Sequence, residues 1–193
     1  MRCSVETSQI GPVPTDPRRV PGPHDCGGAD AIQAMNMEAR SADPTEIDHL
    51  AMLWYEGWRD AHELIVPAEL ARVRTLDSFR ERLRAALAEV HVVGPVGAPH
   101  GFSMLKDDEL YQLFVGRQWR GTGIAAALIA DAEARLAARN VETAWLACAI
   151  GNVRAARFYE KCGWHRAGIV VSQLETPEGV FALDVWRYEK RLR

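Results

Sequence analysis

Hydrophobic side chains recur at helical spacing in the segment that follows Pro44, which predicts an amphipathic helix. The residues at its start fit a capping box. Asp43 can cap the helix, Pro44 suits its first position, and Glu46 can bond back to the cap. The predicted buried face consists of Ile47, Leu50, Ala51, Trp54 and Trp58.

A second stripe of this kind follows Pro67 and predicts another amphipathic helix. Arginines lie between its apolar positions, so we expect them on a solvated face. The apolar positions are Leu76, Phe79, Leu83 and Leu87, and the arginines are Arg80, Arg82 and Arg84. Polar groups also gather where the first helix ends, where they suit either the binding of a polar acceptor or a solvated helix end. These are Glu56, Trp58, Arg59, His62 and Glu63.

Short apolar runs bounded by turn residues predict strands in much of the remaining chain. The turn-rich sequence GPVGAP joins two of them into a hairpin, and TPEG joins the last two. The run over residues 143–150 is almost continuously apolar, which indicates a strand buried on both faces. The other strands are predicted over residues 31–39, 89–93, 100–106, 109–115, 168–174 and 180–188.

Two further helices complete the pattern. One begins near Ile124 and carries Leu128 and Ala132 on its apolar face, and a short one spans residues 153–161 before Gly163. The predicted order is β, α, α, β, β, β, α, β, α, β, β, which is a mixed α/β fold.

The segment between the strand that ends at Val115 and the helix after it is a glycine-interrupted, basic turn. Gly121 and Gly123 lack a Cβ, so the backbone can turn tightly there and approach a ligand. The first N–H groups of the following helix lack intrahelical partners and lie at the positive end of its dipole, which suits a pyrophosphate. We therefore predict a phosphate-binding loop formed by Arg120, Gly121, Thr122, Gly123, Ile124 and Ala125.

Two common glycine patterns do not fit this turn. Gly116 and Gly121 have P-loop spacing, but Thr122 and Gly123 stand where a lysine and a hydroxyl residue are required. The dinucleotide-binding pattern needs a glycine where the chain has Ala126. A nucleotide-binding module is therefore disfavoured.

Residues 118–125, QWRGTGIA, resemble the Q/R-x-x-G-x-G/A acetyl-CoA motif of the GNAT superfamily of N-acetyltransferases. Residues 152–164, NVRAARFYEKCGW, resemble the second motif of that family, N-x-x-A-x-x-F-Y-x-x-x-G-F/W, in the same order and spacing. The resemblance extends over residues 37–193. It implies the GNAT acyl-CoA N-acyltransferase fold, which has a mixed, mostly antiparallel sheet with splayed central strands and flanking helices.

The resemblance implies an N-acetyltransferase with acetyl-CoA as co-substrate and no metal, in which a primary amine of a small molecule or peptide attacks the thioester directly. Tyr159 matches the motif tyrosine beside the CoA sulfur and is the candidate general acid. Asn152 matches the asparagine that contacts the cofactor. The backbone of Leu113 and Val115 matches the strand that pairs with pantetheine.

The base is less closely defined by the resemblance. Glu109 matches a glutamate that some family members use to draw the amine proton through water, but it could equally be a solvated charge beside Asp107 and Asp108. Tyr111 and Glu56 are the reserve candidates. If Glu109 and Tyr159 face the core, the alternative is a catalytically idle acyl-CoA-binding sensor on the same fold.

Composition adds limits to this picture. The 193 residues suit one domain, and a hydrophobic content of 48% is enough for a sizeable core. A net charge of −3 without a dominant basic block argues against a nucleic-acid partner. The sequence has no apolar run typical of a signal peptide or a membrane span, so we expect a cytoplasmic protein with no membrane partner. Assembly as a homodimer stays open.

The ends and the cysteines are less informative. Residues 1–30 hold five of the ten prolines and little periodic hydrophobicity, so we expect a flexible N-terminal extension before a domain over residues 31–193. The four cysteines, Cys3, Cys26, Cys148 and Cys162, are scattered and predict neither a disulfide framework nor a zinc site.

Overall fold

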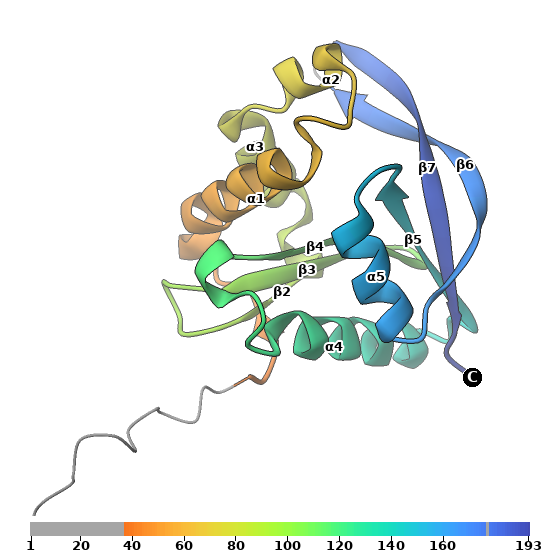
Figure 1. The fold of residues 1–193 in the computed structure, drawn as a ribbon. Helices are drawn as coiled ribbons and strands as arrows, with labels where there is room; N and C mark the ends of the chain where they lie inside the picture. The colour runs from red at the N-terminus through yellow and green to blue at the C-terminus, as the bar shows by residue number, and fades with distance from the viewer. Residues whose placement is uncertain (1–36, 177) are drawn as a thin grey trace, which may run out of the picture. The chain divides into compact units, whose positions relative to one another are not determined.

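The computed structural model describes residues 37–176 and 178–193, and the expected extension over residues 1–30 lies outside this part. The described chain folds as a sheet of seven strands in the order β1-β2-β3-β4-β5-β7-β6, with helices on its two faces (Figure 1). The strands are β1 (Arg40–Ser41), β2 (Val90–Val93), β3 (Gly101–Lys106), β4 (Glu109–Val115), β5 (Thr143–Ala149), β6 (His165–Thr176) and β7 (Gly179–Arg191). The α-helices are α1 (Ile47–His62), α2 (Ala68–Val73), α3 (Leu76–Ala86), α4 (Ile124–Ala138) and α5 (Val153–Lys161).

All neighbouring strands are antiparallel except β4 and β5, which run parallel and share one residue pair, Glu109 with Trp145. Asp108 reinforces this pair, because its carbonyl accepts a hydrogen bond from the Trp145 backbone (3.2 Å) and its carboxylate accepts one from the indole N–H (2.9 Å). Beyond this point the two strands diverge. The predicted mixed sheet with splayed central strands is therefore confirmed.

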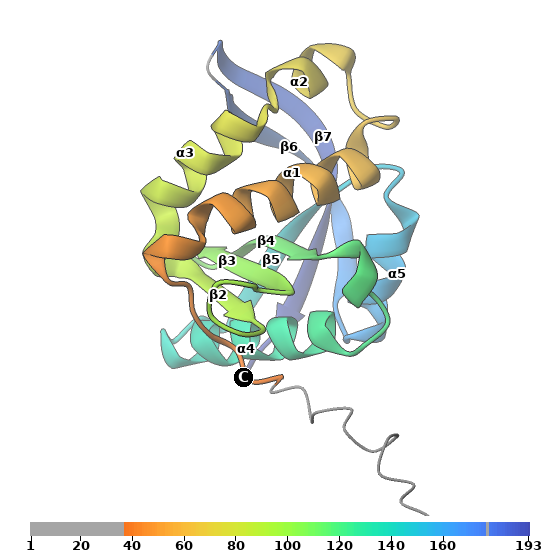
Figure 2. The ribbon, with the colours of Figure 1, turned by 90° about the vertical axis from the view of Figure 1, so that its left-hand side faces the viewer.

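Helices α1 and α3 lie on one side of β2–β4, and α4 lies on the other (Figures 1 and 2). Trp54 of α1 is fully buried, and its ring centroid lies 4.8 Å from that of Phe79 and 5.6 Å from that of Phe102. A second core under α4 and α5 includes Leu136 and Trp164. The sheet thus packs between two apolar layers, and β4 contacts both of them.

Most of the predicted elements are confirmed, with three differences. The short helix α2 was missed, because its six residues show too little periodicity to predict a helix. Of the strand predicted over residues 31–39, the first six residues lie outside the described chain, and the observed strand begins at Arg40. The closing hairpin extends beyond both predicted strands. No helix in the described ranges is long and apolar enough to cross a bilayer.

The predicted solvated face of α3 is wrong for one arginine. Arg82 is half-buried, its guanidinium carbon lies 4.6 Å from the centroid of the Trp54 ring, and it donates a hydrogen bond to the Tyr111 hydroxyl. Arg80 instead pairs with Asp48 and Asp77 at the surface. Burial of Arg82 depends on its contacts with α1 and β4, which helical spacing within α3 alone does not reveal.

The predicted capping box is confirmed, and its glutamate does more than cap the helix. The buried Glu46 carboxylate accepts hydrogen bonds from the Arg40 guanidinium (2.7 and 2.9 Å) and from the backbone N–H groups of Asp43 (2.8 Å) and Gly97 (2.9 Å). Burial alone would raise the pKa of Glu46, but these bonds outweigh it and hold the pKa below its ordinary value. Glu46 thereby ties α1 to β1 and to the β2–β3 turn.

We predict that Glu46→Ala lowers the free energy of unfolding by about 3 kcal/mol, because it leaves Arg40 and two N–H groups without their acceptor. Urea titration measures this loss. Because the folded pKa is depressed, the stabilisation is fully present above the ordinary carboxyl pKa of about 4.3 and declines as the pH falls through the folded value. The control is the exposed Glu69, whose alanine variant should change little; equal losses for Glu46→Ala and Glu69→Ala would contradict the role of the network.

Candidate functional site

The loop after β4 has the backbone of an anion site. Gly121 and Gly123 adopt φ angles of +80° and +94°, which other residues rarely adopt, and Gly123 is the N-cap of α4. The first hydrogen bond of the helix runs from the Ala127 N–H to the Gly123 carbonyl (3.0 Å). The N–H groups of Ile124, Ala125 and Ala126 therefore have no acceptor within the helix and lie at its positive end.

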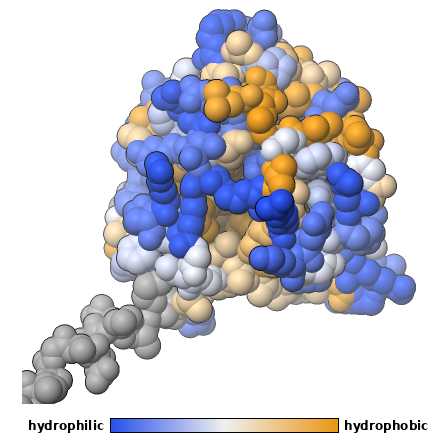
Figure 3. Space-filling model, in the orientation of Figure 1, coloured by the Kyte–Doolittle hydropathy of each residue, from blue (hydrophilic) through white to orange (hydrophobic). Residues whose placement is uncertain are grey.

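A groove of about 400 Å³ starts at this loop and continues between β4 and α5; we call it the cofactor groove. Figure 3 shows this face hollowed, with a paler floor between charged residues. The groove brings together most of the residues predicted for cofactor binding: Leu113, Val115, Arg120, Gly121, Gly123, Ala125, Asn152 and Tyr159. Arg154 and Phe158 are among the lining residues to which sequence analysis assigned no role.

Three of the predicted residues contribute differently from what their side chains suggested. The Ile124 side chain is fully buried in the core, so only its backbone N–H can meet a ligand. The Thr122 hydroxyl donates to the Trp119 carbonyl (2.7 Å) and stabilises the turn. The Asn152 side chain caps α5 by accepting a hydrogen bond from the Ala155 N–H (3.2 Å). The side chains of Ile124, Thr122 and Asn152 thus stabilise the core, the turn and the start of α5, respectively.

A smaller cavity of about 60 Å³ lies between the diverging strands; we call it the strand gap. Tyr159 lines both the strand gap and the cofactor groove. Burial raises the pKa of Tyr159 above its ordinary value, and the nearby Cys148 and Cys162 thiols add to this effect. The phenol therefore keeps its proton at neutral pH, and in the described chain its hydroxyl has no hydrogen-bond partner. It is free to act as a donor in the gap.

On the other side, β4, α1, α2 and the β6–β7 hairpin enclose a cavity of about 110 Å³; we call it the inner cavity. Glu109 is among its lining residues, and it is 9% exposed. The inner cavity and the strand gap are adjacent, because they share the lining residues His62, Tyr111, Gln112, Ala147 and Ala149. Glu109 and Tyr159 thus line neighbouring cavities, and neither is enclosed by packed core alone.

Burial raises the pKa of Glu109 to about 7; Lys106 opposes this shift, while Asp108 and Asp107 add to it. Of the two interpretations left open above, the solvated turn charge is therefore wrong, since the carboxyl group is buried. A carboxyl group with a pKa near the ambient pH is an effective acceptor of protons.

His62 is a polar residue of the site whose position the sequence did not define. Its Nδ1 lies 3.0 Å from the Trp58 carbonyl, which can only accept, so Nδ1 carries the proton and Nε2 keeps its lone pair. Burial lowers the pKa of His62 and keeps the ring neutral. It lines both the strand gap and the inner cavity. The i, i+4 spacing from Trp58 was the available signal, but it does not show which cavity the ring meets.

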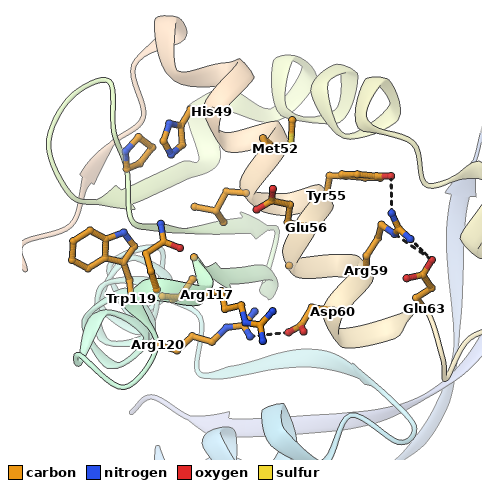
Figure 4. A pocket seen from close by; sticks show the side chains of 16 residues that line it. His49, Met52, Tyr55, Glu56, Arg59, Asp60, Glu63, Arg117, Trp119 and Arg120 are labelled. Carbon is orange, nitrogen blue, oxygen red and sulfur yellow. Dashed lines mark hydrogen bonds and ion pairs between the residues drawn. The ribbon is translucent and has the colours of Figure 1, made fainter.

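An outer pocket of about 770 Å³ lies between the exposed face of α1 and the loop after β4 (Figure 4). Glu56, a reserve base, lies in this pocket and lines neither the strand gap nor the inner cavity. Tyr111, the other reserve, lines both of those cavities, but its hydroxyl accepts a hydrogen bond from Arg82. As candidate general bases, Glu56 and Tyr111 are therefore less well placed than Glu109.

Asp60 lines the outer pocket and pairs with two arginines of the cofactor groove. One of its carboxylate oxygens accepts hydrogen bonds from Arg120 (2.7 Å) and Arg154 (2.9 Å), and Figure 4 shows Arg120 pointing toward it. These bonds, led by the one from Arg154, lower the pKa of Asp60. Two basic residues of the groove are thus held by one carboxylate from α1. No cluster of three or more metal-ligating side chains occurs within residues 37–176 and 178–193.

Residues 47–164 match the family model described as the acetyltransferase (GNAT) family. The chain belongs to this family. The motifs that resembled GNAT sequences thus reflect true membership, and the splayed strands and glycine loop are its structural features in this chain.

Solved structures of the same fold agree. A GCN5-related N-acetyltransferase from Rhodopseudomonas palustris superposes with a TM-score of 0.63 at 18% identity, covering 79% of this chain and 94% of that one. The PaiA N-acetyltransferase from Thermoplasma acidophilum, in complex with coenzyme A, gives 0.60 at 16%, covering 80% and 98%. YncA from Salmonella typhimurium, a putative acetyltransferase with acetyl-CoA, gives 0.56 at 14%, covering 80% and 93%. No curated protein sequence matches the chain significantly.

Proposed function

We propose that this GNAT protein is an N-acetyltransferase that transfers acetyl from acetyl-CoA to a primary amine of a small molecule or peptide, by direct attack of the amine on the thioester. The observation that carries this proposal is the arrangement of Glu109 and Tyr159 in adjoining cavities, with the cofactor groove leading to the strand gap. It favours catalysis over an idle acyl-CoA-binding sensor, which would use the cofactor groove and the strand gap but would have no need of a buried carboxyl group in a second cavity beside them.

In this proposal the N–H groups at the start of α4 and the Arg120 guanidinium hold the pyrophosphate of acetyl-CoA. The pantetheine arm lies along β4 past Leu113 and Val115, where β5 has diverged and leaves the strand edge accessible. The thioester then reaches the strand gap beside Tyr159. Structures of family members with coenzyme A or acetyl-CoA support the choice of co-substrate.

The amine must lose a proton before it can attack. An amine with a pKa of about 10.4 is neutral in only about one molecule in 2,500 at pH 7, a deficit of roughly 4.6 kcal/mol. Glu109 takes this proton, directly or through a water, and its pKa of about 7 suits the task. Tyr159 keeps its proton at the same pH and donates it to the departing thiolate.

The test of this function is an acceptor screen with saturating acetyl-CoA. We expect amine-dependent release of free thiol, measured colorimetrically, with the acetylated product identified by mass spectrometry. An idle sensor would bind coenzyme A in calorimetry but release no thiol with any amine.

We predict that Gly121→Val reduces coenzyme A affinity by more than about tenfold, measured by calorimetry. A Cβ at Gly121 would meet no protein atom within 4 Å, so it would project into open space at the loop, and a branched residue at φ +80° would distort the turn. The control is Gly179→Val at the β6–β7 turn, which has a φ of +113° and equally open surroundings outside the groove. If both variants are folded and bind coenzyme A like the parent, the loop is not the phosphate site.

We predict that Glu109→Gln lowers turnover by about 10² to 10⁴ at neutral pH, because it keeps the size of the side chain but not its basicity. The loss should diminish as the pH rises toward the pKa of the amine, at about 10.4, where the base is no longer needed. In the parent, turnover should rise with pH through about 7 as Glu109 loses its proton. Steady-state rates from pH 6 to 10 measure both effects.

Two variants serve as comparisons for Glu109→Gln. Tyr159→Phe removes the acid and should cost less, about 10- to 10²-fold, without recovery at high pH, since a thiolate of pKa about 8.5 leaves fairly well unaided. Glu56→Gln, in the outer pocket, should match the parent. If Glu109→Gln follows the parent at every pH while Glu56→Gln does not, the base has been misassigned.

A further inference from the structure

Arg74, which follows α2, is a charged residue in a buried position without an acidic partner. It is only 4% exposed, and its guanidinium donates a hydrogen bond to the Glu175 backbone carbonyl (3.1 Å). Within residues 37–176 and 178–193, no carboxylate lies within 4.0 Å of it. Burial lowers its pKa to about 10, so it is still charged at neutral pH. The Glu175 carboxylate attracts this charge but forms no ion pair with it, so the buried charge is only partly compensated and an anionic ligand here would stabilise it.

Arg82 lies in the same cavity and also lacks an acidic partner among the described residues. Its guanidinium packs on the Trp54 ring and donates to the Tyr111 hydroxyl, which orients it. Neighbouring arginines on the outside of the same helices do have partners: Arg72 pairs with Glu178, and Arg80 pairs with Asp48. The exposed Arg84 of α3 also has no ion pair among the described residues, but it lies in solvent, whereas Arg74 and Arg82 line the inner cavity.

The charges of the inner cavity leave room for an anion. Arg74 and Arg82 line this cavity together with one acid, Glu109, whose pKa is raised by burial to about 7. The planar guanidinium offers paired N–H donors that match a carboxylate. The volume of about 110 Å³ equals that of about four water molecules at roughly 30 Å³ each, which suits a compact polar group. The arginines of the cofactor groove, Arg120 and Arg154, do not line this cavity, so the anion is distinct from the cofactor phosphates.

We propose that the amine acceptor is amino-acid-like, with a carboxylate that Arg74 and Arg82 bind in the inner cavity while its amino group faces Glu109. This inference rests on the proposed function, because it names the substrate class of the same site. The two arginines favour an acceptor with an anionic group beside its amine. They disfavour polycationic amines, which would meet like charge in a buried setting.

The test compares standard α-amino acids with their decarboxylated counterparts, such as leucine with isoamylamine. We expect a kcat/KM about 10- to 100-fold higher for the preferred amino acid than for its matched amine, the range of one or two charge-assisted hydrogen bonds. Arg74→Met and Arg82→Met should abolish this preference by raising KM for the amino acid, with little change for the amine. Arg84→Met, on the exposed side of α3, is the matched control and should keep the preference.

Calorimetry with the same amino acids and coenzyme A present separates this inference from the function. Binding that Arg74→Met weakens, without acetyl transfer, would support the carboxylate site and overturn the enzymatic function. Transfer to decarboxylated amines at equal or higher kcat/KM than to amino acids would overturn the carboxylate site and leave the function standing. Absence of both binding and transfer would overturn both. Thermal denaturation identifies a variant that has lost its fold, and Arg74→Lys, which keeps the charge, should then retain part of the preference.

Discussion

The point at which β4 and β5 stop pairing determines where this protein has cavities that a reaction could use. The two strands share one residue pair, and Asp108 secures it by accepting hydrogen bonds from both the backbone and the indole of Trp145. Past that point β4 stays paired with β3, and β5 stays paired with β7. Beyond Glu109, the edge of β4 that faces β5 therefore pairs with no strand of the described chain. The strand gap, the cofactor groove and the inner cavity all depend on this divergence.

Burial around the divergence acts on two acids in the same direction but with different chemical results. It raises the pKa of Glu109 to about 7, which turns a weak base into one suited to neutral pH. It raises the pKa of Tyr159 further from neutrality, which keeps a proton available there. His62, neutral and with a defined tautomer, lies on the boundary between the two cavities. In the proposed reaction, the surroundings of Glu109 and Tyr159, and not residue type alone, distinguish the proton acceptor from the proton donor.

Local patterns predicted the parts of the structure that depend on local chemistry. The capping box at Asp43 and Glu46, the glycine loop at Gly121 and Gly123, and the apolar face of α1 follow from neighbours within a few residues, and all are confirmed. Hydrophobic spacing also predicted the order of elements apart from α2, and the resemblance to GNAT motifs implied the divergence of the strands. Neither required knowledge of long-range contacts in this particular chain.

What the sequence did not predict depends on segments that meet only in the folded chain. Arg74 is buried because its guanidinium reaches the carbonyl of Glu175 on β6. Arg82 is withdrawn from solvent by Trp54 and Tyr111, which belong to α1 and β4. No spacing within α2 or α3 encodes either contact, so a basic helix face and a buried basic cavity have the same sequence pattern. The same holds for Asp60 of α1, which meets Arg120 and Arg154 from two other elements.

This last contact has a consequence for selectivity. Asp60 compensates one of the two positive charges of Arg120 and Arg154, so a phosphate that enters the groove must exchange with this carboxylate for the same N–H donors. The gain from such an exchange is a difference between two similar terms, so anions that offer phosphate alone obtain little from it. A ligand that also fills the apolar channel along β4 has a second source of affinity. In the proposed complex, the carboxylate of α1 thereby makes binding depend on the apolar channel along β4 as well as on the phosphate groups.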